Sequence, residues 1–262
     1  MQSLNFYLKN PTRALIKVFL KFNFLFSDKL HLKILFRLEM GYKLNLKNPK
    51  TFSEKIQWLK LYNRKPEYTT MVDKYAVKEY VANIIGKEYI IPTLGVWNTP
   101  EEIDWDRLPN QFVLKTTHGG GGGGVVICKN KNSFNKEKAI KILRRSYRND
   151  IYKSLKEWPY KDVPKRIIAE KFMEISTSNK DDGDLPDYKF YCFDGEPMYC
   201  QVIRDRRSKE TIDFYDMEWN HMPFVGLNPV VKNGLNPVVK PICLKNMIKI
   251  CRKLAKDISR AY

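Results

Sequence analysis

The chain has 262 residues, of which 43% are apolar, enough to build a sizeable core in one large domain or two closely packed ones. This composition excludes an intrinsically disordered chain. Lys and Arg outnumber Asp and Glu by 47 to 29, which gives a formal net charge of +18 and points to an anionic partner.

The positive charge is concentrated near the N-terminus, where residues 1–65 hold 14 Lys or Arg against three acids. Within this region, Ala14–Phe26 is mostly apolar, with Lys17 and Lys21 four residues apart on one helical edge. Such a helix either packs on the domain with its lysines exposed or lies in a membrane interface, and both interpretations stay open. The run is too short to span a bilayer, and no signal peptide is evident.

Two other classes of protein find no support. No zinc-finger spacing, RNP-type strand or helix-turn-helix pattern is present, so nothing in the sequence points to nucleic acid as a partner. The cysteines are odd in number and form no C-x-x-C, which argues against a disulfide framework or a zinc site and fits a reducing cytoplasm. They are Cys128, Cys192, Cys200, Cys243 and Cys251.

The first half of the chain reads as mainly helical. Thr51 and Glu54 have the spacing of a capping box, and Thr99 has the position of an N-cap ahead of Pro100 and a short helix. The sequence "EYIIPTLGVW" predicts a short buried strand or strand pair before it. Helices are expected over about 11–25, 28–40, 52–62 and 73–85.

The second half is rich in predicted strands. "QFVLKTT" and "VVICKN" flank a run of six glycines, and "RIIAEKFM", "DYKFYCFDGEPMYCQVIRD" and "TIDFYD" follow. Helices are expected over 133–148 and 244–262. The sequence therefore predicts an α+β fold with antiparallel sheets and packed helices. The segment "GLNPVVK" occurs twice, at 226–232 and 234–240, and we interpret it as a duplication that lengthens a surface loop.

The glycine run carries the sharpest chemical signal. A P-loop would need Gly-Lys-Ser/Thr opening a helix, and a dinucleotide fingerprint would need a strand, spaced glycines and a helix; neither is present. The glycines instead join two β-branched runs, which predicts a hairpin whose backbone N–H groups can approach a polyphosphate. A flexible connection is the alternative. Lys115 precedes the run and favours the phosphate-binding interpretation, since a buried lysine without an anion would be costly.

Several segments in order resemble the TupA-like branch of the ATP-grasp superfamily and, more distantly, the D-alanine–D-alanine ligases. The resemblance covers roughly residues 30–262 and implies an ATP-grasp-like fold in which the glycine-rich hairpin is a lid. The segments are "KNPKTFSEKIQWLKL", "VDKYAVKEYV", "IIPTLGVW", "FVLKTTHGGGGGG", "IIAEKFM" and "DYKFYCFDGEP". With it we expect three parts: a basic helical segment over 1–50, a lead-in subdomain over 51–110 and the nucleotide-binding region over 111–262.

The resemblance also implies roles for individual residues. Lys74 and Lys115 match the two lysines that contact the nucleotide, and Glu170 matches the acid that accepts from the adenine amino group. Lys189 and Arg204 are candidates for holding a substrate carboxylate or phosphate and for catalysis. The remaining expected nucleotide-binding residues are His118, Gly119, Gly120, Gly121 and Gly122 at the lid, Lys171 to Met173 beside the base, and Asp187 near the ribose.

Each of these residues has a plainer interpretation. Lys74 could belong to an ordinary exposed helix start, Glu170 could form a strand-end ion pair with Lys171 or Arg166, and Asp187 could be a turn residue. Of the three histidines, His118 is of interest only through its place beside the lid.

By the same resemblance the protein uses ATP and Mg²⁺ to phosphorylate a carboxylate, and an amine or similar nucleophile then displaces phosphate from the acyl phosphate. The family is associated with bacterial cell-surface polysaccharide, such as capsule, so a carboxylate-bearing sugar or amino acid is the expected substrate. The place of work would be the cytoplasm or the inner face of the membrane.

The expected metal ligands are the weak point of the resemblance. The strands that usually carry them would follow residue 262, so we expect a fragment or a degenerate member. Asp213 and Asp216 are unsupported substitutes, and the metal ligands stay unknown. A glycosyltransferase using a sugar nucleotide and a non-catalytic nucleotide- or glycan-binding protein remain alternatives.

Overall fold

The chain forms two compact units in the computed structural model. The first comprises Met1–Tyr80 and Ile90–Phe172, and the second Val81–Tyr89 and Met173–Tyr262. The structure describes residues 10–120, 123–174, 185–206, 208–225, 231–256 and 258. Gly121 and Gly122 of the lid, and most of the first "GLNPVVK" copy, therefore lie outside the described residues. The expected three-part division stays a prediction.

The first unit begins with antiparallel helices whose ends follow local capping rules. The side chain of Ser27 accepts a hydrogen bond from the backbone of Leu30, and Thr51 with Glu54 forms the expected capping box. The first helix is shorter than predicted, because it ends at Lys21 and a 3₁₀ turn replaces its last part. These elements are α2 (Pro11–Lys21), η1 (Asn23–Leu25), α3 (Asp28–Met40) and α4 (Phe52–Tyr62).

These helices pack around a small apolar cluster, and an ion pair and a hydrogen bond connect α3 to residues 152–156. Asp28 at the start of α3 forms ion pairs with Arg64 at 2.8 Å and with Lys156 at 3.5 Å. It also accepts a hydrogen bond from Tyr152 of α8 (Ile151–Leu155) at 2.8 Å. The cluster itself contains Leu32, Phe36, Leu44 and Leu46, with Trp58 and Leu61 beside them.

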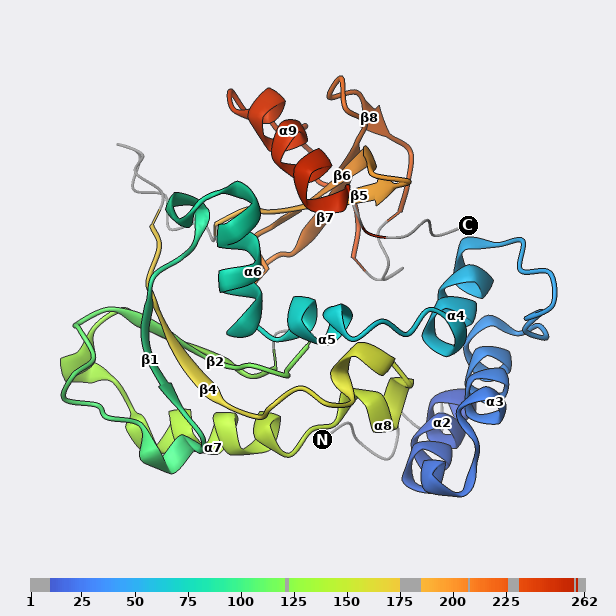
Figure 1. Ribbon diagram of the computed structural model, residues 1–262, viewed down its shortest axis with the longest axis horizontal. Coiled ribbons are helices and arrows are strands. Elements are labelled where there is room, and N and C mark those ends of the chain that lie inside the picture. Colours follow the sequence, from blue (N-terminus) through green and yellow to red (C-terminus); the bar gives the residue numbers. More distant parts are fainter. Residues whose placement is uncertain are drawn as a thin grey trace. The chain divides into compact units, whose positions relative to one another are not determined.

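A four-stranded antiparallel sheet and further helices form the rest of the first unit (Figure 1). Its order is β1-β4-β2-β3, so β4, the last of these strands in sequence, lies between β1 and β2. The strands are β1 (Thr93–Trp97), β2 (Phe112–Thr116), β3 (Val125–Cys128) and β4 (Ile167–Lys171). The other helices are α5 (Glu67–Val72), α6 (Ala76–Ile85), whose last turn belongs to the second unit, and α7 (Lys136–Tyr147). Short 3₁₀ turns are η2 (Lys87–Tyr89), η3 (Pro100–Glu102), η4 (Lys131–Ser133) and η5 (Trp158–Tyr160).

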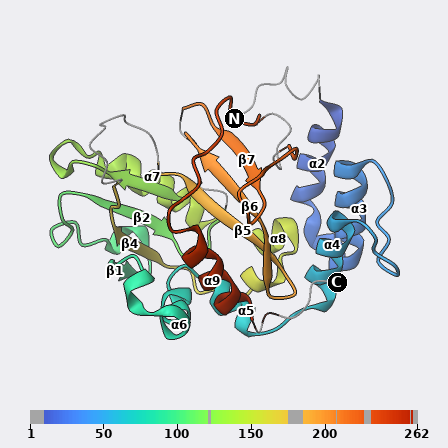
Figure 2. The ribbon, with the colours of Figure 1, turned by 90° about the horizontal axis from the view of Figure 1, so that it is seen from above.

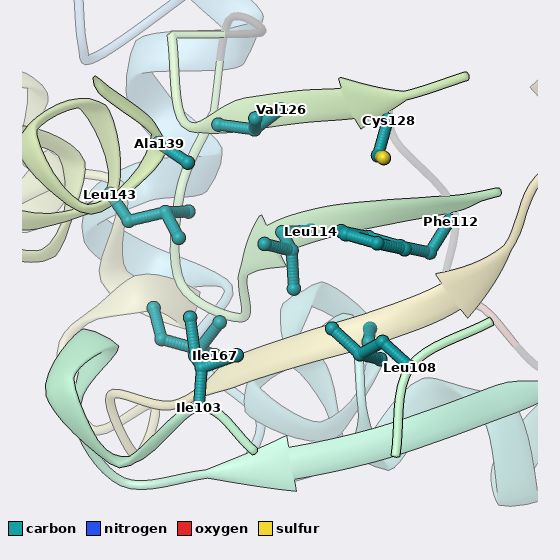
Figure 3. Packing of buried hydrophobic residues seen from close by; sticks show 10 residues of the cluster. Ile103, Leu108, Phe112, Leu114, Val126, Cys128, Ala139, Leu143 and Ile167 are labelled. Atoms are coloured by element: carbon teal, nitrogen blue, oxygen red, sulfur yellow. The ribbon is translucent and has the colours of Figure 1, made fainter. Parts of the chain in front are cut away.

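One face of this sheet packs against α7 in the main core of the unit (Figure 3). Along β2, Phe112 and Leu114 are fully buried on this face, while Val113 and Lys115 alternate to the other face. Each large side chain buried here stabilises the fold by about 1.5–3 kcal/mol. The core is made of Ile103, Leu108, Phe112, Leu114, Val126, Cys128, Ala139, Leu143, Ile167 and Ala169.

The second unit is built on another four-stranded antiparallel sheet, in the order β5-β6-β7-β8. Asp194 and Gly195 both have positive φ, at 52° and 83°, as a tight two-residue turn between paired strands requires. Helix α9 (Leu244–Ala255) packs against β5 and β6 (Figure 2). The strands are β5 (Asp187–Phe193), β6 (Glu196–Arg204), β7 (Thr211–Tyr215) and β8 (His221–Met222).

The second copy of the repeat lies on this sheet as an irregular segment. The backbone N–H of Val238 donates to the hydroxyl of Tyr215 at 2.7 Å, and the indole of Trp219 donates to the carbonyl of Val238 at 2.9 Å. Leu235, in contrast, is 96% exposed. The backbone N–H of Gly234 donates to Asp213 at 3.1 Å, so the backbone of the copy is held near both ends while the side chain of Leu235 is exposed.

The α+β prediction with antiparallel sheets and a glycine-rich hairpin is confirmed by these two sheets and their helices. Among the described residues, no helix is both long and apolar enough to cross a membrane.

Candidate functional site

The ends of the glycine run are held against the sheet and α7, as a hairpin lid requires. β2 pairs with β3 up to Lys115 and Val125, on either side of the run. The hydroxyl groups of Thr116 and Ser146 lie 2.8 Å apart beneath it. A methyl group at Gly124 would lie only 2.6 Å from Cβ of Ser146. Glycine is thus needed here so that the backbone can approach α7 closely.

Lys115 lies on the face of the sheet away from α7, opposite an acidic side chain. It forms an ion pair with Glu170, which occupies the neighbouring strand β4 and is 6% exposed. Lys78 of α6 pairs with the other oxygen of Glu170 at 2.6 Å. Burial would raise the pKa of Glu170, but the hydrogen bonds from Lys115 and Lys78 outweigh burial and hold it below its ordinary value. Glu170 is therefore ionised at neutral pH.

Lys74 is brought to the start of the lid from the other side. Its backbone N–H donates to the carbonyl of Thr117 at 3.1 Å, and its ammonium group donates to the carbonyl of Gly119. Burial and the nearby charge of Lys115 both lower the pKa of Lys74. Two lysines that repel each other beside a glycine-rich turn form a site that an anion would stabilise.

A buried ion pair fixes the position of Lys74. Asp73 is 2% exposed and accepts from Arg166 at 2.6 Å and from the backbone of Tyr75 at 2.9 Å. The guanidinium of Arg166 also stacks on the ring of Tyr75, 4.8 Å from its centre. These contacts hold the residues on both sides of Lys74, so its backbone is fixed in position.

His118 lies beside the lid but does not add a third positive charge. It is 4% exposed and meets the ring of Tyr147 edge to face at 5.8 Å. Burial, followed by the charge of Lys165, lowers its pKa, so the imidazole is neutral at pH 7. Neither ring nitrogen has a hydrogen-bond partner of ordinary geometry in the described part of the chain.

The structure therefore brings together Lys74, Lys115, His118, Gly119, Gly120 and Glu170 in the first unit. Lys171 ends β4 with an exposed side chain, and its backbone N–H already donates to the carbonyl of Pro92 at 3.0 Å. These groups could hold a polyphosphate with two ammonium groups and backbone N–H donors, and an adjacent base with the carboxylate of Glu170.

The other candidates belong to the second unit, where each charged one has a partner. Asp187 accepts from Arg206 at 2.8 Å and lies 3.5 Å from Lys189. Arg204 pairs with the buried carboxylate of Asp213 at 3.0 Å. Met173, at the start of this unit, is 43% exposed.

The two acids considered as metal ligands are occupied by other groups. Asp213 is 1% exposed and accepts from Arg204, from His221 at 3.1 Å and from the backbone of Gly234 at 3.1 Å. Asp216 caps a turn through the backbone N–H groups of Glu218 and Asn220. Across the described residues, no group of three or more metal-ligating side chains is found.

The family comparison agrees with this geometry. The family model described as TupA-like ATPgrasp matches residues 54–260. The chain belongs to the TupA-like ATP-grasp family. All of the residues that the structure groups in the first unit lie within this match. Membership of the family indicates, in general terms, an ATP-dependent, ligase-like function. No curated protein and no solved structure matches the chain.

Sequence reasoning missed three residues of this TupA-like ATP-grasp site. Lys78 was detectable, because the predicted helix over 73–85 would place it one turn after Lys74, although α6 itself begins at Ala76. Ser146 and Arg166 were not, since their contacts join segments 30 and 93 residues apart.

Proposed function

We propose that the protein is an ATP-dependent ligase that joins a carboxylate to an amine, or a similar nucleophile, in the synthesis of a bacterial cell-surface polysaccharide. The observation that carries this proposal is the convergence of Lys74 and Lys115 on the glycine-rich lid, with Glu170 beside them. Family membership supports the use of ATP, and the carboxylate, the nucleophile and the pathway are the proposed part.

In this proposal Lys74 and Lys115 neutralise the phosphates of ATP, and the backbone N–H groups of the lid add hydrogen bonds to them. Glu170 accepts a hydrogen bond from the adenine amino group. Lys78 keeps Glu170 compensated when Lys115 turns to the phosphates, so that no buried carboxylate is left alone.

The lid has a second task, which is to exclude water. ATP supplies a γ-phosphoryl group, which passes to a carboxylate oxygen and leaves ADP. The nucleophile then attacks the acyl carbon, phosphate departs with the bonding electrons, and the amine loses a proton as the amide forms. An acyl phosphate is readily hydrolysed, so closure of the glycine hairpin would keep water away from it until the nucleophile reacts.

The remaining candidates have roles that rest on the family resemblance. Lys189 and Arg204 would hold the carboxylate of a sugar or amino acid, Asp187 would approach the ribose, and Lys171 to Met173 would line the base. The net charge of +18, from 47 basic and 29 acidic residues, favours such anionic substrates. We place the reaction inside the cell. Membrane contact is proposed separately, from the N-terminal helices.

Calorimetric titration tests the proposal, with ATP and a uridine-diphosphate sugar as competing ligands, with and without Mg²⁺. Selective binding of ATP, lost by tenfold or more in Lys115→Ala, supports it, since a charge-assisted hydrogen bond contributes about 1.5–3 kcal/mol. Lys138→Ala, on the exposed surface of α7, is the matched control. Preference for the sugar nucleotide would favour a glycosyltransferase, and unchanged ATP affinity would remove Lys115 from the site.

A further inference from the structure

We propose that the outward surface of α2 and η1 binds the surface of a membrane that contains anionic lipids. The surface, termed here the α2–η1 surface, is defined by large apolar side chains that are about half exposed or more. They are Leu15 at 54%, Val18 at 53%, Phe22 at 51%, Phe24 at 74% and Leu25 at 66%. Folded proteins seldom expose so many large apolar groups within eleven residues unless they meet a partner or a membrane.

The exposed side chains are not those that fix the helix to the protein. Ile16 is buried, and Phe19 packs against Phe26 and His31 with ring centres 5.3 and 5.0 Å apart. Leu15, Val18 and Phe22 have the spacing of another helical face. The inner contacts of α2 with α3, which lie side by side in Figures 1 and 2, therefore leave this face without a protein partner in the described residues.

The apolar turn at the end of α2 is also held in place. The side-chain amide of Asn23 donates to the carbonyl of Lys153 at 2.7 Å. This bond fixes η1 against α8, while Phe24 and Leu25, the other two residues of the turn, remain exposed. Insertion of these two side chains into a lipid interface thus needs little ordering of the backbone.

Charge decides in favour of a lipid surface rather than an apolar protein partner. Between residues 10 and 44 the chain has seven Lys or Arg against Asp28 and Glu39. Both acids are neutralised, Asp28 by Arg64 and Lys156, and Glu39 by Arg13 at 3.3 Å. Exposed Phe and Leu next to lysines in the chain, such as Lys21 and Lys29, are the combination that binds anionic bilayers, since each lysine near the lipid adds attraction while the apolar groups insert.

The basic character continues along α3. Lys33 and Arg37 have the spacing of one helical face, and both line an open groove of about 380 Å³. Lys33, Arg37 and Lys43 give it three cations, while Ile34, Leu38 and Leu44 give it apolar walls. Long basic side chains of this kind can lie along apolar surface and present their charge to phosphate groups.

Vesicle co-sedimentation of the full chain tests this surface, with phosphatidylcholine vesicles and with vesicles containing about a third phosphatidylglycerol as the two arms. We expect binding to the anionic vesicles alone, weakened by added salt. The double variant Phe24→Ser with Leu25→Ser should reduce it at least tenfold. Leu235→Ser with Ile242→Ser removes two apolar side chains of the second unit that are even more exposed and should leave vesicle binding unchanged.

A second pair of double variants separates the effect of lysines near the α2–η1 surface from the effect of total charge. Lys21→Gln with Lys29→Gln should weaken vesicle binding at least tenfold, whereas Lys138→Gln with Lys141→Gln, which removes the same charge from α7, should have little effect. Circular dichroism and ATP titration report whether each variant is folded, and neither measurement should change. Equal binding to neutral and anionic vesicles, absence of binding, or the same loss in both pairs would overturn the proposal. So would a dimer of the wild-type chain on gel filtration that Phe24→Ser with Leu25→Ser converts to monomer.

Discussion

The ammonium group of Lys78 lies 2.6 Å from one carboxylate oxygen of Glu170, while Lys115 occupies the other oxygen. One buried acid therefore compensates two lysines that come from a helix and from the neighbouring strand. The ammonium group of Lys78 also donates to the carbonyl of Ile91 at 2.6 Å, so two acceptors hold it in place. This arrangement leaves Lys115 as the partner of Glu170 that can exchange its contact for a phosphate.

Replacement of Lys78 by Met tests whether Lys78 stays paired with Glu170 while Lys115 moves to a phosphate. Without Lys78, transfer of Lys115 to a phosphate would leave Glu170 buried and unpaired, which is costly. We expect ATP affinity to fall by roughly three- to tenfold, or about 0.7–1.4 kcal/mol, as measured by calorimetric titration. Lys138→Met is the control for the loss of a surface lysine. An unchanged affinity would mean that Lys78 has no part in nucleotide binding.

Two glycines of the lid should respond differently to the same substitution. A methyl group at Gly124 would lie 2.6 Å from Cβ of Ser146, whereas one at Gly123 would meet no atom within 4 Å. We expect Gly124→Ala to destabilise the protein by about 1–3 kcal/mol through overpacking and Gly123→Ala to be nearly neutral. Urea denaturation measures both. Equal effects would show that the lid does not rest on α7 through Gly124.

Much of the fold could be predicted from the sequence because its signals are local. The capping box of Thr51 and Glu54 is contained within four residues, and the β2–β3 hairpin is marked by β-branched runs on both sides of the glycines. The end of α2 at Lys21 was predicted wrongly, since apolar periodicity continues through Phe22 and Leu25. The anchor that holds the following turn, from Asn23 to Lys153, spans 130 residues and has no local signal.

The candidate site shows the same limit. Lys115 and the glycines form one continuous motif, so their grouping follows from the chain itself. The partner of Glu170, in contrast, depends on strand order: β4 lies between β1 and β2, which places Glu170 opposite Val113 and within reach of Lys115. Nothing in the sequence near Glu170 specifies that neighbour, and Lys171 and Arg166 were equally available as partners by spacing.

The ion pair of Asp73 and Arg166 should contribute strongly to the free energy of unfolding, and the effects of the two residues should depend on each other. Asp73→Ala leaves Arg166 without its partner, and Arg166→Met leaves a carboxylate that is 3% exposed unpaired. We expect each single change to cost about 3–5 kcal/mol. The double variant should cost less than the sum of both, because no buried charge is then left alone. Urea denaturation of the four proteins at pH 7 gives the coupling. Additive effects would show that the two residues stabilise the fold independently.

Acid should weaken the protein in part through Glu170. Its pKa in the folded state lies below the ordinary value of 4.5, with burial opposing the shift and Lys115 and Lys78 producing it. The folded state therefore releases this proton more readily than the unfolded chain. The resulting stabilisation is complete above pH 4.5 and is lost as the pH falls through the lower pKa of the folded state.

The variant Glu170→Gln isolates this contribution. It should be less stable than the wild type at pH 7, because both lysines lose their counter-charge, but its unfolding free energy should decline less steeply between pH 5 and pH 3. Urea denaturation at half-unit steps of pH measures the two slopes. Glu54→Gln is a useful comparison, since hydrogen bonds from the backbone of Thr51 and Lys50 lower the pKa of Glu54 as well, at a distance from the lid. If Glu170→Gln followed the same pH slope as the wild type, the carboxylate of Glu170 could not be the acid that holds Lys78 and Lys115 in place.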